Sequence, residues 1–265
     1  MKTFDLKSVT KLLAALTLVA VGSSAFAVST WNLSSICGGT PDQAISGTGT
    51  KDCGPLTLSG FSTNNGTTSA GTTFAAAAIY DWGTAGLGVV ANFEAAASTG
   101  PHATDNVYGT DAMLIKFDTA TSLSALTIGW NGSDNATGVY NDSDISVLAW
   151  TGAGAPPAGA VGGSTAAGLV AAGWTLVGDY ANVGTLTNNT QSITTAISSS
   201  YWLVSAYDTA FGGGNGLTSA NDAFKLVSVA GTQTFKTPEP GSLALLGLGL
   251  VGVVAARRRS LTAAK

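Results

Sequence analysis

The segment AMLIKF at residues 112–117, followed by LSALTIGW at residues 123–130, decides the fold class. Both runs combine apolar, β-branched and aromatic residues in the short, partly alternating pattern that is typical of β-strands. Similar runs lie at residues 56–58, 145–150, 174–177, 201–207 and 223–229, with clusters of Gly, Asn and Asp between them. Many short strands separated by polar turns predict an all-β fold, an antiparallel β-sandwich or jelly roll.

The remainder of this central region adds one short helix and one long loop. Residues 164–172 are rich in Ala and Leu and predict a short helix between strands. Residues 152–163 contain Pro156-Pro157 among Gly and Ala. We expect a surface loop there rather than a domain boundary, because the strand patterns on its two sides are alike.

The N-terminus has the composition of an export signal. A positive segment, a short apolar run and a small-residue exit follow one another: Lys2, Lys7 and Lys11, then residues 12–21, then Ala25-Phe26-Ala27. This order predicts a signal peptide at residues 1–27 that is cleaved after Ala27.

The C-terminus joins an apolar run to a basic cluster. Residues 241–256 contain no charged residue, and Arg257, Arg258 and Arg259 follow at once. The run is somewhat shorter than the ~20 residues of a typical membrane span, and flanking arginines favour the cytoplasmic side. We therefore expect a short transmembrane helix, with residues 260–265 in the cytoplasm and the chain before the helix facing outward.

Between these ends, residues 28–236 are expected to form a single surface domain of acidic character. Four lysines stand against twelve Asp and one Glu, which gives a net charge of −9. Nucleic-acid binding requires a basic surface, so this balance argues against a nucleic-acid partner.

Two cysteines, Cys37 and Cys53, lie near the start of this domain. Disulfides form in exported proteins, and two cysteines without clustered histidines do not make a zinc site. The pair predicts one disulfide that contributes about 3 kcal/mol by restricting the unfolded chain.

Carboxylate and amide side chains gather at three places in the sequence. These are Asp105, Asn106 and Asp111; Asp134, Asn135, Asn141, Asp142 and Asp144; and Asn221 with Asp222. Calcium prefers hard oxygen ligands from such turns, and we expect Asp142 and Asp144 as ligands, joined by Asp134, Asp105 or Asp111. The spacing is not that of an EF-hand, and capping of turns by Asx side chains explains the same pattern.

The material for catalysis is sparse. His102 is the single histidine, it stands beside Pro101, and no G-x-S-x-G motif accompanies it. We therefore expect no enzyme activity and no catalytic residues. Five of the six tryptophans suit either a core or a sugar-stacking face, and the strand patterns around most of these five favour the core: Trp82, Trp130, Trp150, Trp174 and Trp202.

The tripeptide Pro238-Glu239-Pro240 stands directly before the apolar run and its arginines. The two prolines hold Glu239 in an extended conformation that a processing enzyme can grip. This order of parts, at residues 237–259, resembles the PEP-CTERM sorting signal of Gram-negative bacteria, whose tail is also labelled the C-terminal domain of ice-binding proteins. The resemblance implies recognition by exosortase, a membrane-embedded, cysteine-dependent transpeptidase.

The central region also resembles a family of exosortase-dependent surface proteins. The residues that carry this likeness are Asp105-Asn106, Asp111, Phe117, residues 128–130, 142–147 and 201–207. The two resemblances imply an inner-membrane-held precursor that reaches the cell surface or extracellular matrix. We expect a structural or adhesive role there, beside exopolysaccharide. A carbohydrate- or ice-binding module on the same scaffold is the alternative.

Overall fold

Strand β8 (Asp111–Trp130) runs through the centre of the fold for 20 residues. It unites the two runs that the sequence presented as separate strands, because the residues between them include no Gly or Pro and contain threonines suited to extended backbone. Its first half pairs with β4 (Leu56–Ser62) and β12 (Ser199–Ala206). Its second half pairs with β13 (Ala223–Gln233) and β11 (Thr190–Ser192), again antiparallel.

The computed structural model describes residues 28–64, 72–91, 102–132, 142–157, 160–214, 216–233 and 247–252. The remaining strands are β1 (Val28–Asn32), β2 (Gln43–Ser46), β3 (Thr50–Asp52), β5 (Ala75–Asp81), β6 (Leu87–Val90), β7 (Thr104–Asp105), β9 (Ile145–Trp150) and β10 (Trp174–Tyr180). The helices are α2 (Leu33–Cys37), α4 (Ala166–Ala172), η1 (Gly83–Ala85), η2 (Val183–Thr185), η3 (Thr187–Asn189) and η4 (Thr209–Phe211).

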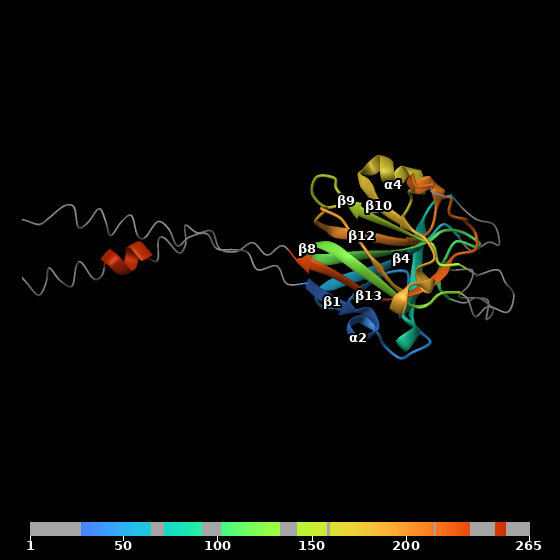
Figure 1. The fold of residues 1–265 in the computed structure, drawn as a ribbon, viewed down its shortest axis with the longest axis horizontal. Helices are drawn as coiled ribbons and strands as arrows, with labels where there is room; N and C mark the ends of the chain where they lie inside the picture. The colour runs from blue at the N-terminus through green and yellow to red at the C-terminus, as the bar shows by residue number, and fades with distance from the viewer. Residues whose placement is uncertain are drawn as a thin grey trace, which may run out of the picture. The chain divides into compact units, whose positions relative to one another are not determined.

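The main sheet closes on itself. Strands β8, β4, β5, β6 and β13 pair in that order, and β13 returns to β8, so that five antiparallel strands form a closed barrel. Beyond the barrel, β12, β9 and β10 extend the sheet from β8, and β1 lies on β13 (Figure 1). The prediction of an antiparallel β fold is confirmed. The sandwich of two sheets is replaced by one closed sheet, because β8 is long enough to pair with both β4 and β13.

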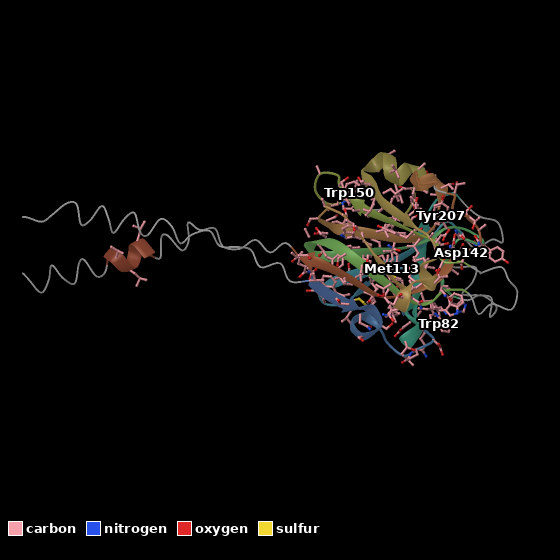
Figure 2. All side chains as sticks on the ribbon, in the orientation of Figure 1. Trp82, Met113, Asp142, Trp150 and Tyr207 are labelled. Carbon is pink, nitrogen blue, oxygen red and sulfur yellow. A yellow bond between two sulfur atoms is a disulfide. The ribbon has the colours of Figure 1, made fainter. Side chains whose placement is uncertain are left out.

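Two hydrophobic cores lie on opposite faces of the extended part of the sheet. The barrel core includes Met113, labelled in Figure 2, together with Val147 and Trp202. The second core packs Leu148, Trp174 and other residues beneath α4, which Figure 1 shows beside β9 and β10. All six residues of β9 are buried for this reason.

Helix α4 begins and ends with the expected capping chemistry. Thr165 precedes it and its side chain accepts a hydrogen bond from the Gly168 N–H at 3.0 Å. Gly173 follows it at a φ of 122°, which only glycine adopts easily. The short helix predicted at residues 164–172 is confirmed within two residues.

The predicted disulfide between Cys37 and Cys53 is present, with their Cα atoms 4.6 Å apart. It joins the end of α2 to the chain between β3 and β4, and both cysteines are buried against the barrel core. The disulfide therefore ties the N-terminal strand and helix to the strands that begin the barrel.

Candidate functional site

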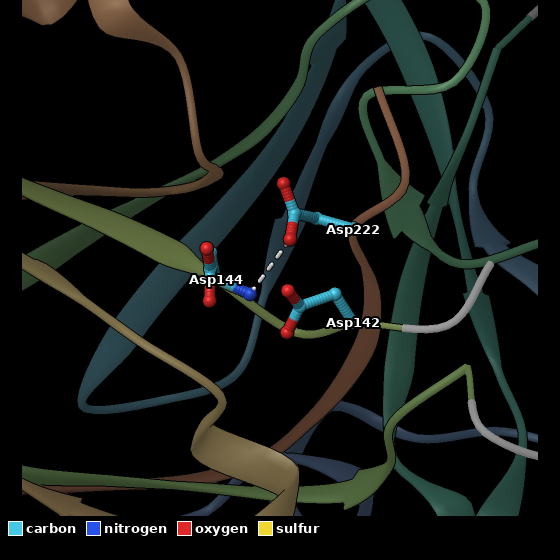
Figure 3. A group of neighbouring side chains, drawn as sticks. All are labelled: Asp142, Asp144 and Asp222. Carbon is cyan, nitrogen blue, oxygen red and sulfur yellow. Dashed lines mark hydrogen bonds between the residues drawn. The ribbon is translucent and has the colours of Figure 1, made fainter. Parts of the chain in front are cut away.

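Three aspartates from two distant parts of the chain meet at one end of the barrel (Figure 3). Asp142 and Asp144 precede β9, and Asp222 precedes β13. One carboxylate oxygen of each lies within 4.8 Å of the others, and both Asp144 and Asp222 are buried. This spacing suits a single divalent cation, for which three carboxylates supply half or nearly half of the oxygen ligands.

Backbone pairing brings the aspartates together. Asp142 and Asp222 form an isolated parallel bridge, in which the Ala223 N–H donates to the Asp142 carbonyl at 3.0 Å. The Asp144 N–H donates to Asp222 Oδ1 at 2.9 Å, as drawn in Figure 3. The cluster thus joins the entry of β9 to the entry of β13.

Neighbouring loops complete this network. Asn106 donates through Nδ2 to Asp222 Oδ2 and to the Tyr207 carbonyl, and its Oδ1 accepts from the Asp222 N–H. The Asn182 N–H donates to Asp144 Oδ1 at 2.7 Å. Four segments that are far apart in the sequence are therefore held together by side-chain amides and carboxylates.

The electrostatics of the cluster are unfavourable to charged carboxylates. Burial, and then the nearby charge of Asp142, raise the pKa of Asp144 to about 6. Burial, with the charges of Asp144 and Asp142, raises the pKa of Asp222 to about 7. Among the described residues no lysine or histidine pairs with the three aspartates, so protons or a cation must relieve the repulsion.

The structure brings together two of the five predicted metal residues. Asp142 and Asp144 lie in the cluster, and Asp134 lies outside the described residues. Asp105 and Asp111 form a separate neighbouring pair, in which the Asp105 N–H approaches Asp111 Oδ2 at 3.4 Å. Asn106, the residue next to Asp105, is the one that forms hydrogen bonds with Asp222.

Asp222 is the residue that the predicted ligand set lacked. Its place beside Asn221 in the sequence singled it out as an acidic turn residue, but spacing along the chain gives no sign of a partner 78 residues away. The contact between Asp144 and Asp222 is evident only from the structure, in which the segments that precede β9 and β13 lie side by side.

The tryptophans divide into two groups. Trp150, Trp174 and Trp202 are buried in the cores, as the strand patterns predicted. Trp82 and Trp130 are half-buried and both face Lys225. His102 packs its ring against Tyr80 and Trp82 at centroid distances of 5.5 and 5.7 Å.

A second compact unit includes the C-terminal region, of which residues 247–252 are described and are helical. Leu248, Leu250 and Val251 on this helix are exposed. Within the described part of the chain, no helix is long and apolar enough to cross a membrane. The predicted signal peptide, the tripeptide at residues 238–240 and the arginines at residues 257–259 lie outside the described residues, as does most of the predicted transmembrane helix.

A family model matches residues 236–259 of this chain, and its description is the PEP-CTERM protein-sorting motif. The C-terminus is a PEP-CTERM sorting motif. The PEP-CTERM match includes Pro238-Glu239-Pro240, the apolar run and all three arginines, as the sequence predicted. No curated protein matched the chain.

The PEP-CTERM motif implies an exported protein that exosortase sorts to the cell surface. The match begins three residues after the end of β13, so the motif follows the barrel almost directly. Nothing in the motif itself specifies what the barrel does.

Proposed function

We propose that the barrel at residues 28–233 is a structural or adhesive surface module, displayed after exosortase processes the PEP-CTERM tail. The observation that carries this proposal is the order of parts: a disulfide-linked β-barrel whose last strand, β13, ends three residues before the sorting motif begins. The role is non-catalytic. This part of the proposal is supported by the carboxylates of the described cluster, which accept hydrogen bonds from backbone N–H groups, as structural carboxylates do.

The sorting step is tested by replacing Pro238-Glu239-Pro240 with three alanines. We expect an uncut, membrane-held precursor, because the extended backbone imposed by the prolines is lost. Replacing Pro156-Pro157 of the surface loop with two alanines is the matched control, and it should mature like the wild type. Immunoblotting of membrane, surface and medium fractions reads out both variants.

The adhesive role is tested separately with a chain that ends at Gln233. This truncation should release a folded barrel that no longer supports attachment of cells to a surface or to one another. Normal maturation of the alanine variant would overturn the sorting assignment. Undiminished attachment with the truncated chain would overturn the adhesive role and leave the sorting assignment intact.

The aspartate cluster favours calcium as a structural ligand of this module. We propose that Asp142, Asp144 and Asp222 supply carboxylate oxygens to one ion, which replaces their mutual repulsion with attraction. An ion at a hundredfold excess over its Kd stabilises the fold by about 2.7 kcal/mol, which corresponds to a Tm increase of about 5–10 °C for a domain of this size.

Thermal unfolding with calcium and with chelator tests this site. The double variant Asp142→Asn/Asp144→Asn should lose the calcium response, whereas Asp118→Asn, an exposed aspartate on β8, should keep it. A wild-type Tm that is the same in calcium and in chelator would leave turn capping as the role of these residues.

A further inference from the structure

Lys225 is a buried lysine whose ammonium group has no polar partner among the described residues. Its side chain is 7% exposed, and its Nζ lies 4.2 Å from the ring centroid of Trp82 and 4.6 Å from that of Trp130. At such distances the electron-rich ring faces attract the ammonium charge. The ammonium group is therefore held between two indole faces.

The sheet fixes this arrangement. Lys225 is the third residue of β13 and lies directly opposite Trp130 at the end of β8. Trp82 stands just before η1. Two glycines allow η1 to lie close to both strands. A Cβ on Gly86 would lie 2.8 Å from the Leu226 backbone, and a Cβ on Gly129 would lie 2.6 Å from the Ala85 carbonyl. The two indoles are thus placed by backbone contacts rather than by mobile side chains.

The ammonium group lacks a hydrogen-bond acceptor. Within the described chain, the Lys225 ammonium group forms no hydrogen bond or ion pair, and its interactions are the two rings and the charge of Asp42. Trp82 Nε1 is likewise a donor without an acceptor. Trp82 Nε1 is fully buried, whereas Lys225 is 7% exposed, so a small part of its side chain remains accessible to an incoming group.

Leaving a charged donor unpaired in such surroundings is costly. Burial lowers the pKa of Lys225 to about 8, and the charge of Asp42 opposes this only in part. An anion that reached Nζ would supply the missing acceptor. The edges of aromatic rings are electropositive and also attract an anion that approaches between them.

The two indoles beside the ammonium group belong to an aromatic rim of four side chains, Trp82, Trp130, Tyr80 and His102. Tyr80 and His102 continue the row of rings beyond Trp82, and all four residues of this rim are half-buried. Such side chains present an apolar body to a ligand and retain a polar tip. The ligand that fits has one carboxylate for the ammonium group and an apolar ring face for the rim.

We propose that Lys225, Trp82 and Trp130 form a binding site for the carboxylate of an acidic saccharide, such as a uronic acid. This site is distinct from the aspartate cluster and from the sorting motif, and it does not depend on the structural or adhesive role. An acidic protein partner fits less well, because the domain itself carries a net charge of −9 and repels extended acidic surfaces. A single carboxylated sugar meets one local positive charge, and the more distant acids are screened at physiological salt.

Isothermal titration calorimetry with trigalacturonic acid tests the proposal on the exported protein. We expect binding that weakens tenfold or more in Lys225→Met and changes less than twofold in Lys116→Met, an exposed lysine on β8. A neutral trisaccharide should bind at least tenfold more weakly, and so should acetate, which lacks the ring. Equal binding by Lys225→Met, or by the neutral sugar, would overturn the proposal.

Two further measurements keep the test decisive if Lys225→Met does not fold. Wild-type affinity should fall as the pH rises through about 8, since the ammonium group loses its charge there. Lys225→Arg should bind without that step. In the described chain, the charge of Asp42 acts on Lys225, and Tyr80 and His102 belong to the aromatic rim. A pH step that persists in Lys225→Arg would therefore belong to one of these three groups and would contradict the proposal. Triglutamate binding as tightly as trigalacturonate would indicate an acidic peptide instead.

Discussion

At the scale of single residues, the aspartate cluster is the feature with the clearest physical consequence. Its carboxylates are buried or half-buried beside one another, and the raised pKa values of Asp144 and Asp222 show that the folded protein holds their protons tightly. Groups whose pKa is raised by folding stabilise the protein while they are protonated. That contribution is complete below the unfolded value and is lost as the pH rises through the folded one.

In the presence of chelator, we therefore expect the Tm to fall between about pH 4 and about pH 7. Asp142→Asn should reduce this fall, because it removes the charge that repels Asp144 while leaving an oxygen for the Ser143 N–H. Differential scanning calorimetry across this range checks the prediction. Asp118→Asn is the control, and the same reduction there would show that overall charge, not the cluster, sets the slope.

Gly86 is a second residue with a defined role, since it lets η1 approach β13. Its φ is 102° and its Cβ position lies against the Leu226 backbone. We expect Gly86→Ala to lower stability by about 2–4 kcal/mol through backbone strain and overpacking. Urea denaturation measures this effect.

Gly212 provides the comparison for Gly86. It has the same φ of 102°, but open space surrounds its Cβ position. Gly212→Ala should cost about 1–2 kcal/mol through backbone conformation. An equal loss in the two variants would show that the close approach of η1 contributes nothing.

At the scale of elements, the sequence predicted strand identity better than strand pairing. Alternation and β-branched residues located β4, β8, β9, β10, β12 and β13, and the composition of residues 164–172 located α4. These signals are local. The two sets of neighbours of β8 include β4 and β13, which lie far away from it in the sequence, so the barrel was not foreseen.

The candidate sites show the same division. Asp142 and Asp144 are two residues apart and were predicted together, whereas Asp222 joins them only through the pairing of two loops. Trp82, Trp130 and Lys225 come from three distant segments. Sequence reasoning had no means to separate these two tryptophans from those that fill the cores.

The disulfide links elements, and its removal should act at that level. Cys37→Ala/Cys53→Ala frees α2 from the chain between β3 and β4, and we expect a loss of about 3 kcal/mol. The Tm should fall by roughly 6–12 °C. Intact mass with thiol alkylation verifies the bond in the wild type, and an unchanged Tm in the double variant would show that packing alone holds this region.

At the scale of the whole molecule, export defines the ends of the mature chain. We expect the signal peptide to be removed after Ala27, so that the exported protein begins at Val28, the first residue of β1. Mass spectrometry of the N-terminal peptide of surface material checks this. A mature N-terminus inside β1 would contradict it, because β1 pairs with β13 from Val28 onward.

The pairing of β1 with β13 also determines how the barrel bears load. Val28 is paired with Thr232, so the chain enters and leaves the barrel side by side. Tension applied through the C-terminal segment reaches the barrel at Gln233 and acts along β13. It therefore loads the hydrogen bonds between β13 and its neighbours β1 and β8 in shear. Many bonds must then break together, whereas β10, at the far edge of the sheet, can peel from β9 one bond at a time. A domain that is held through its last strand therefore carries load in shear, the direction in which we expect its sheet to resist best.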